Sequence, residues 1–543
     1  MAEIAAPAYH ARSSTAATAS ERPNLDNKMG RSALWIFFGI LIAGIGYATH
    51  SIVSDVNEAH VPVTTWAPFV LLGIALLVAL GFEFVNGFHD TANAVATVIY
   101  THSLPPHFAV VWSGLWNFFG VLVSSGAVAF GILALLPVEL ILQVGSGAGF
   151  AMVFALLIAA IIWNVGTWYL GLPASSSHTL IGSIIGVGVA NQLMHGASGT
   201  SGVDIGQVTK IGWSLLLSPL IGFGVSALLM LILKRVAKNP ALYREPKGRA
   251  APPWWIRSIL VLTCTGVSFA HGSNDGQKGM GLIMLILIGT VPTAYALNRA
   301  MPDTQITQFL AISQVTEASL QQAAHGVPVP ADARATLMEF VRSHKSTPET
   351  VPALGQLIGQ IAAEVDRDGN LKHVPIESVQ NVRNDMYVAA EAIRFLGKDA
   401  SLKFDEPTSK NLGEMKKSLD AATKFIPLWV KVAVAIALGL GTMIGWKRIV
   451  VTVGEKIGKT HLTYAQGASA ELVAMTTIAA ADAFGLPVST TQVLSSGVAG
   501  TMAANRSGLQ FATVRNLMLA WVLTLPAAVL LSGSLYFVFV HLF

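Results

Sequence analysis

Two pairs of short polar motifs interrupt the long apolar runs of this chain, and they constrain its fold more than any other feature. Residues 86–93 and 271–278 form one pair, and each motif centres on an aspartate. Residues 173–178 and 487–492 form a second pair, in which hydroxyl side chains follow a proline. Polar groups are costly inside hydrocarbon and usually mark function there. Matching interruptions in two halves of a membrane protein are typical of a transporter's binding site.

The composition predicts a protein that crosses the membrane many times. Only 12% of the 543 residues are charged and 53% are hydrophobic, whereas an average soluble domain carries about 25% charged residues. A helix needs about 20 apolar residues to cross the bilayer core, so we expect about ten to twelve membrane segments, two of them broken. The candidate spans are 33–53, 66–101 (broken), 107–136, 147–170, 173–194, 213–236, 256–299 (broken), 426–446, 464–485, 487–504 and 512–541.

The order of the motifs predicts how these segments are arranged. Aligning Asp90 with Asp275, and Pro173 with Pro487, gives the same motif order in both halves. We therefore expect an all-α polytopic membrane protein with two inverted repeats of about five helices, broken helices at the midplane and an extra N-terminal span. The expected parts are a disordered tail (1–32), the extra span (33–60), the first repeat (61–240), a linker and the start of the second repeat (241–299), a hydrophilic helical insertion (300–424) and the rest of the second repeat (425–543).

Charged residues predict which loops face the cytoplasm. Basic residues gather in the loops at 234–257 and 447–459, and acidic residues lie near Asp55 and Glu58. Cytoplasmic loops are enriched in Lys and Arg, so an N-inside arrangement is expected, with the insertion outside. Two crossings by 256–299 would instead place the insertion in the cytoplasm. We interpret the insertion as a packing or regulatory domain without chemistry of its own.

The proline motifs predict helices that begin inside the membrane. Pro is favoured in the first turn of a helix, and Ser or Thr is favoured at its N-cap. A helix N-terminus offers free N–H groups and a positive dipole end, which suit an anion. One such motif would more often be an ordinary cap, but two matched copies favour an anion site. The hydroxyl residues are Ser175, Ser176, Ser177, Ser489, Thr490 and Thr491.

The two aspartates predict coupling between an anion and a cation. A carboxylate repels an oxyanion unless a cation lies between them or the carboxyl is protonated. Asp90 and Asp275 are therefore expected to bind H⁺, Na⁺ or a metal, although either could also cap the helix that follows it. Asn93 and Lys278 each lie three residues later, on the same helical face.

Other ionisable residues within apolar segments are weaker candidates. Glu471 is a candidate cation ligand or proton carrier, because intramembrane acids are functional by default. Glu83 and Asp482 could instead face a helix end. His89 and His178 could carry protons near neutral pH, or simply satisfy local hydrogen bonds.

Several classes of protein and site are excluded. The net charge of +4 is too small to suggest nucleic-acid binding, and the single cysteine, Cys264, allows no intrachain disulfide. There is no P-loop, so ATP is not expected to drive transport directly. Residues 366–370 resemble the start of a calcium loop, but Leu371 occupies the position that requires glycine. We expect no resident metal, no cofactor and no enzymatic site.

The motifs carry a resemblance to a known family. Residues 87–96 and 272–281 resemble the paired signatures of the inorganic phosphate transporter (PiT) family, and 173–178 and 487–492 resemble its second pair. The Gly-Gln-Lys-Gly-Met-Gly form of 276–281 is most similar to the bacterial low-affinity branch. That resemblance implies proton-coupled phosphate uptake across the bacterial inner (plasma) membrane, with phosphate carried as a neutral complex with divalent metal.

The resemblance also implies site residues and leaves alternatives open. Glu471 is a coupling-ion candidate together with the two aspartates. Other family members use Na⁺ or move sulfate, so a Na⁺-coupled phosphate symporter and a sulfate or other oxyanion permease are alternatives. A passive anion channel is an alternative from another functional class. A homo-oligomer is compatible with the sequence, but no motif requires one. The implied phosphate ligands are Asp90, Asn93, Ser175, Ser176, Ser177, Asp275, Lys278, Ser489, Thr490 and Thr491.

Overall fold

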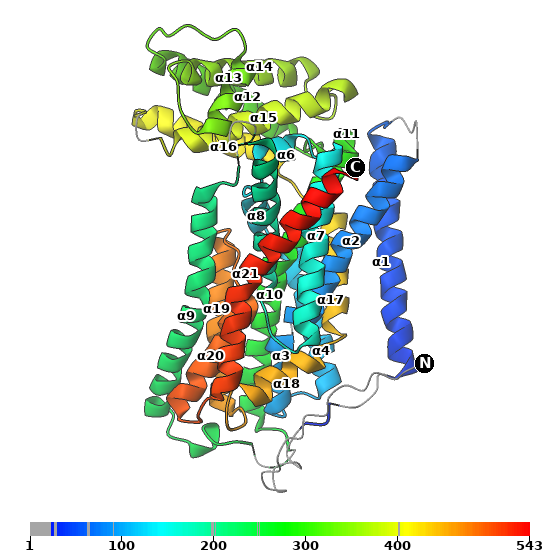
Figure 1. The fold of residues 1–543 in the computed structure, drawn as a ribbon, viewed down its shortest axis with the longest axis vertical. Coiled ribbons are helices and arrows are strands. Elements are labelled where there is room, and N and C mark those ends of the chain that lie inside the picture. Colours follow the sequence, from blue (N-terminus) through cyan, green and yellow to red (C-terminus); the bar gives the residue numbers. More distant parts are fainter. Residues whose placement is uncertain are drawn as a thin grey trace.

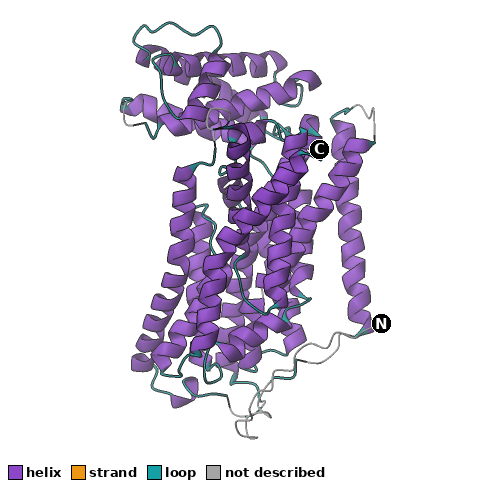
Figure 2. Cartoon of the chain, in the orientation of Figure 1, coloured by secondary structure: helices purple, strands orange, loops and turns teal. Residues whose placement is uncertain are grey.

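A computed structural model describes most of the chain, and the described residues form helices and loops without a β-strand (Figure 2). It covers residues 23–25, 30–61, 66–90, 92–196, 200, 202–246, 248, 250–399 and 402–542, without the side chains of Ala67, Ala92 and Asn93. The helices that make up the long body are α1 (Arg31–Glu58), α2 (Ala67–Asp90), α3 (Ala92–Tyr100), α4 (Pro106–Val123), α7 (Gly147–Tyr169), α8 (Ser176–His195), α9 (Ile205–Val236), α10 (Trp254–Thr290), α17 (Leu428–Thr442), α19 (Tyr464–Ala483), α20 (Thr490–Asn505) and α21 (Phe511–Val540).

Six of the described helices are long and apolar enough to cross a membrane, and a bent pair formed by α16 (Glu406–Thr423) and α17 raises this number to seven. They include α1, α4, α7, α9 and α21, together with a span formed by α2 and α3. Three of the four polar motifs lie on α8, α10 and α20, and the buried residues of these helices include the motif residues. Buried polar residues lower the hydropathy of these helices, so length and composition alone understate how many enter the bilayer.

Helices of the first half pack mainly against helices of the second half. Helix α20 packs on α9 and α8 packs on α21, while α10 packs on α4 and α2 packs on α17. From the middle of the body, α8 leads toward one end and α20 toward the other (Figure 1). Each pair thus joins a helix from one half to a helix from the other.

One expected feature of the second half is wrong. The stretch 256–299 was expected to contain a broken helix, but α10 runs without interruption from Trp254 to Thr290. Its glycines serve close packing rather than unwinding, since a Cβ at Gly272 would lie 2.2 Å from the carbonyl oxygen of Asn117. In the first half, the break predicted within 66–101 would fall at residue 91, between α2 and α3, which lies outside the described residues.

A helical segment covers one end of the body (Figure 1). The chain enters and leaves it at one place, where Asn298 N donates to Ala422 O at 2.8 Å and Asn298 Nδ2 donates to Ala421 O at 3.0 Å. Because α10 crosses the body once, this segment lies at the end opposite the basic loops, which favours the predicted outside location. Its helices are α12 (Asp303–Ala323), α13 (Ala333–Ser343), α14 (Thr350–Asp368), α15 (Ile376–Leu396) and α16.

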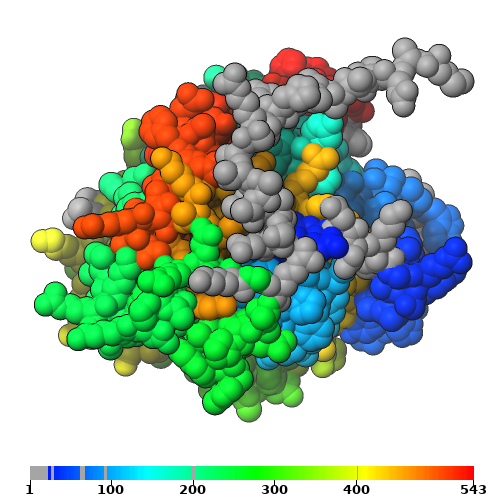
Figure 3. Space-filling model, turned by 90° about the horizontal axis from the view of Figure 1, so that it is seen from below, coloured from blue at the N-terminus to red at the C-terminus, as the bar shows by residue number. Residues whose placement is uncertain are grey.

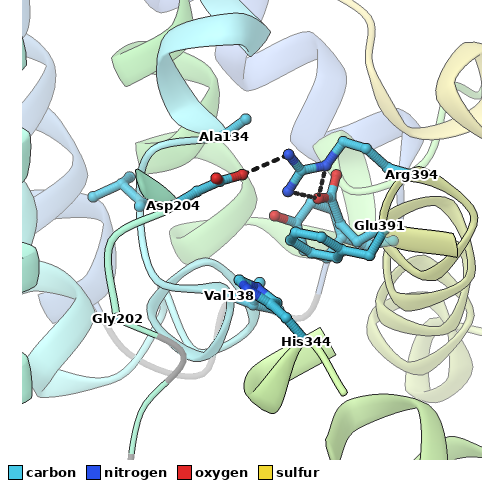
Figure 4. Close-up of a pocket in the computed structure, with 10 residues that line it drawn as sticks. Ala134, Val138, Gly202, Asp204, His344, Glu391 and Arg394 are labelled. Atoms are coloured by element: carbon cyan, nitrogen blue, oxygen red, sulfur yellow. Dashed lines mark hydrogen bonds and ion pairs between the residues drawn. The ribbon is translucent and has the colours of Figure 1, made fainter. Parts of the chain in front are cut away.

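An ion pair fastens this segment to the membrane body (Figure 4). Asp204 caps α9 by accepting a hydrogen bond from Gln207 N at 3.0 Å. Arg394 of α15 donates from Nη1 to Asp204 Oδ2 at 2.6 Å and pairs with Glu391 at the same distance. The start of a membrane helix is therefore tied to the helical cover by a bond between charged groups.

Candidate functional site

The two proline motifs begin helices within the body, as expected. Ser175 Oγ accepts a hydrogen bond from His178 N at 3.2 Å, and Ser489 Oγ accepts one from Gln492 N at 3.2 Å, so these serines are the N-caps of α8 and α20. Ser177 Oγ donates to Val488 O at 2.7 Å and joins the two motifs directly. Two helix N-termini, which both favour an anion, are thus close together in the interior.

Asp90 connects the first half to both helix starts. Its carboxylate accepts a hydrogen bond from Ser176 of α8 and another from Thr491 of α20, the latter at 2.6 Å. His89 Nδ1 lies 2.8 Å from Asp90 Oδ1, and its Nε2 lies 3.1 Å from Thr167 Oγ1. Asp90 as a whole is 4% exposed, so the charge of its carboxylate must be balanced inside the protein.

Asp275 lies beside the same helix starts, on α10. Its Oδ2 atom is 2.7 Å from Lys278 Nζ and 3.4 Å from Ser176 Oγ. Lys278 also donates to Ser177 Oγ at 2.6 Å. Both charged side chains are buried, yet Asp275 Oδ1 and the Thr490 hydroxyl have no hydrogen-bond partner among the described residues. Buried polar atoms without a partner are rare, so these two atoms mark places where a ligand would bind.

His271 joins this cluster, although the sequence reading did not single it out. Asn117 Nδ2 donates to Ser113 O at 2.9 Å, which leaves Asn117 Oδ1 facing His271 Nδ1 at 2.6 Å. His271 Nδ1 must then carry a proton, so its Nε2 presents a lone pair in the neutral ring. That atom lies 3.4 Å from Asp275 Oδ2. Two acceptors this close repel each other unless a proton or cation lies between them.

Three side chains of this cluster could hold a cation between them. One ligand atom from each of Asp90, His271 and Asp275 lies within 4.8 Å of the others. Two carboxylates and an imidazole suit a proton or a small metal cation. The only sequence signal for His271 was its place at the start of the second aspartate motif, one helical turn before Asp275.

Other predicted residues have different surroundings. Glu471 is buried and accepts hydrogen bonds from Thr97 of α3 and from Thr263 of α10, the second at 2.5 Å, rather than from the aspartate cluster. Asp482 accepts from Ser273 Oγ at 2.6 Å and from Gln277 Nε2 at 2.7 Å. The side chain of Asn93 lies outside the described residues.

Comparisons with known proteins point the same way as the motifs. A family model described as "Phosphate transporter family" matches residues 86–532. The chain is 43% identical over 487 residues to the low-affinity inorganic phosphate transporter PitA of Escherichia coli strain K12, covering 86% of this chain and 96% of that protein. It is 41% identical over 491 residues to PitB of the same strain, covering 87% and 97%. Among solved structures, a sodium-dependent phosphate transporter matches with a TM-score of 0.47 and 18% identity, over 86% of this chain and 98% of that one.

Proposed function

The chain belongs to the phosphate transporter family, and from that premise we propose that it is a secondary symporter that takes up inorganic phosphate together with H⁺. It is a multi-pass protein of the plasma membrane, with several apolar helices. Its relatives PitA and PitB are named as low-affinity inorganic phosphate transporters. The observation that carries the proposal is the cluster of Asp90, His271 and Asp275 beside two helix starts.

The substrate would lie between the starts of α8 and α20. Both helix N-termini and their hydroxyl groups present donors to an oxyanion. The hydroxyl of Thr490 has no partner among the described residues, and Lys278 supplies a buried positive charge. These features support phosphate binding near the middle of two inverted repeats, with access alternating between the two faces.

The coupling ion would be held where His271 Nε2 faces Asp275 Oδ2 at 3.4 Å. A proton shared there converts a repulsive contact into a hydrogen bond and lowers the net negative charge before the anion binds. Na⁺ on the same three groups is the second candidate, because carboxylate oxygens are suitable ligands for it. If phosphate entered as a neutral complex with a divalent cation, that cation would balance part of the negative charge of the site.

Reconstitution into liposomes tests the proposal. We expect ³²P-phosphate to accumulate against its gradient when the outside is acid, with no need for Na⁺, and we expect Asp275→Asn to abolish this accumulation. Uptake that follows an imposed Na⁺ gradient alone would replace H⁺ by Na⁺ in the proposal. Movement down the phosphate gradient without any accumulation would indicate a channel, and stronger competition by sulfate than by phosphate would indicate a sulfate permease.

A further inference from the structure

A cavity lined by positively charged side chains, apart from the central site, lies on the face of the basic loops. It has a volume of about 310 Å³ and is lined by Lys447, Arg448, Lys456 and the turn at Tyr169, Leu170 and Gly171. The described residues that line it include three cations and no acid. Figure 3 shows this face, on which the orange-yellow segment near residue 450 reaches the surface. A water occupies about 30 Å³ in the liquid, so the cavity has room for an oxyanion with several waters.

This cavity lies directly beneath the turn that leads into α8. Arg448 Nη1 donates to Tyr169 O at 2.6 Å, and Thr452 Oγ1 donates to Gly171 O at 2.8 Å. Only five residue steps separate Gly171 from Ser176 of the central site, a distance of at most about 18 Å along the chain. The basic cavity and the central site are therefore connected through one short turn.

An aromatic pair separates the cavity from the central site. The Arg448 guanidinium lies 5.2 Å from the ring centroid of Trp168, and the Trp168 ring packs on Phe88 with centroids 5.1 Å apart. Phe88 lies two residues before Asp90. Arg448 thus contacts rings and a carbonyl rather than a carboxylate among the described residues, which leaves its charge available to an anion.

The equivalent place in the other half is built differently. Aligning Asp90 with Asp275 places Phe88 at Ser273, and aligning Pro173 with Pro487 places Trp168 at Asp482. Ser273 and Asp482 form a hydrogen bond at 2.6 Å in place of the aromatic contact. Asp482 places an acid at that position, whereas the aromatic pair on this side leads to three cations, so the two sides of the central site differ in charge.

We propose that the basic cavity is a second phosphate-group site, on the cytoplasmic side, which receives phosphate as it passes the Phe88–Trp168 pair. This inference rests on the proposed function for the direction of travel. Two ammonium groups and a guanidinium suit a phosphate dianion, and Arg and Lys are the usual phosphate ligands in proteins. The same chemistry would accept the headgroup of an anionic lipid, so the test separates the two sources.

The test uses the double variant Lys447→Gln/Lys456→Gln, which keeps Arg448 on its turn. Lys238→Gln is the matched control, because Lys238 is exposed on the other basic loop and does not line the cavity. Exchange of ³²P-phosphate is measured in oriented proteoliposomes while internal and external phosphate are varied separately. The double variant is expected to raise the half-saturating phosphate concentration on the cytoplasmic side about tenfold, and to change the external value less than twofold.

A lipid arm repeats the exchange in liposomes with and without phosphatidylglycerol. Stimulation of the wild type by this lipid, lost in the double variant, assigns the cavity to the lipid headgroup and still supports a phosphate-group site. If the double variant matches Lys238→Gln in both arms, the inference is overturned.

A binding measurement keeps this inference separate from the proposed function. Broadening of the ³¹P signal of inorganic phosphate by the purified Asp275→Asn protein should persist, and it should disappear when the two lysine substitutions are added. If the wild type moves no phosphate, the proposed function fails, while this measurement still decides whether the cavity binds phosphate.

Discussion

Lys278 lies one helical turn after Asp275 on α10, and the two buried side chains form an ion pair at 2.7 Å. This pair compensates one negative charge of the central site and leaves the carboxylate of Asp90 to be balanced by hydrogen bonds and by a coupling cation. Adding a phosphate anion without that cation would place uncompensated charge in a medium of low dielectric. The geometry thus ties binding of the anion to arrival of the cation.

The buried pair should show a strong double-mutant interaction. Asp275→Asn or Lys278→Met alone leaves one charge buried without its partner, which costs about 3–5 kcal/mol, while the double variant removes both charges and should recover much of that loss. Thermal unfolding of the purified proteins measures the cycle. Additive losses would mean that the two charges do not compensate each other.

Substrate affinity should depend on the hydroxyl of Thr490. Because this hydroxyl has no partner among the described residues, Thr490→Val removes no internal hydrogen bond and preserves shape. We expect an unchanged melting temperature and an increase in KM for phosphate of about tenfold or more, since a hydrogen bond to a charged group contributes about 1.5–3 kcal/mol. Thr501→Val is the control, because Thr501 donates to Val498 O on the same helix. Equal KM values for both variants would place phosphate elsewhere.

Coupling should depend on His271. His271→Gln keeps a polar side chain but removes the ring nitrogen that faces Asp275, so accumulation driven by a pH gradient is expected to fall at least tenfold. Phosphate exchange at equal pH on both sides should persist, because the helix starts that bind the anion are unchanged. The comparison of gradient-driven uptake with exchange measures this separation, and His195→Gln, near the end of α8, is the control. Parallel losses in both assays would indicate that His271 only maintains structure.

Docking of the segment that covers one end should depend on Arg394. Arg394→Met removes the bond to Asp204 and should weaken docking by about 1.5–3 kcal/mol, seen as faster proteolysis of the loops between α12 and α16. Arg342→Met is the control, because Arg342 forms an exposed ion pair with Glu339 of its own helix, and such surface pairs contribute about 0–1 kcal/mol. Equal cleavage rates for the two variants would contradict a docking role.

The same contact predicts a response to acid. Burial opposes ionisation of Asp204, but hydrogen bonds from Arg394 and Gln207 outweigh it and hold the pKa of Asp204 below its usual value. A carboxyl with a lowered pKa stabilises the docked form above its ordinary pKa of about 3.9 and loses that contribution as the pH falls through the lower value. Proteolysis by an acid-active protease should therefore accelerate below about pH 4 in the wild type, and Asp204→Asn should remove the change.

The sequence indicated the residues of the candidate site more directly than the course of the helices that carry them. Polar residues within apolar runs are costly wherever they lie, so Asp90, Asp275 and the hydroxyl motifs were visible without coordinates. The stretch 256–299 was expected to be broken because a sequence does not show that Asn117 packs closely against Gly272. The contact of Asn117 with His271 joins α4 to α10, and no local pattern predicts a hydrogen bond between residues so far apart in the chain.

The hydrogen bonds between Asn298 and the backbone of residues 421 and 422 hold the two ends of the covering segment side by side. A compact reporter whose own termini are adjacent can therefore replace residues 300–420 without stretching either flanking connection. Such a chimaera would offer electron microscopy a fiducial mark outside the detergent belt. Its expression level and its phosphate uptake would show whether folding or transport requires the natural segment.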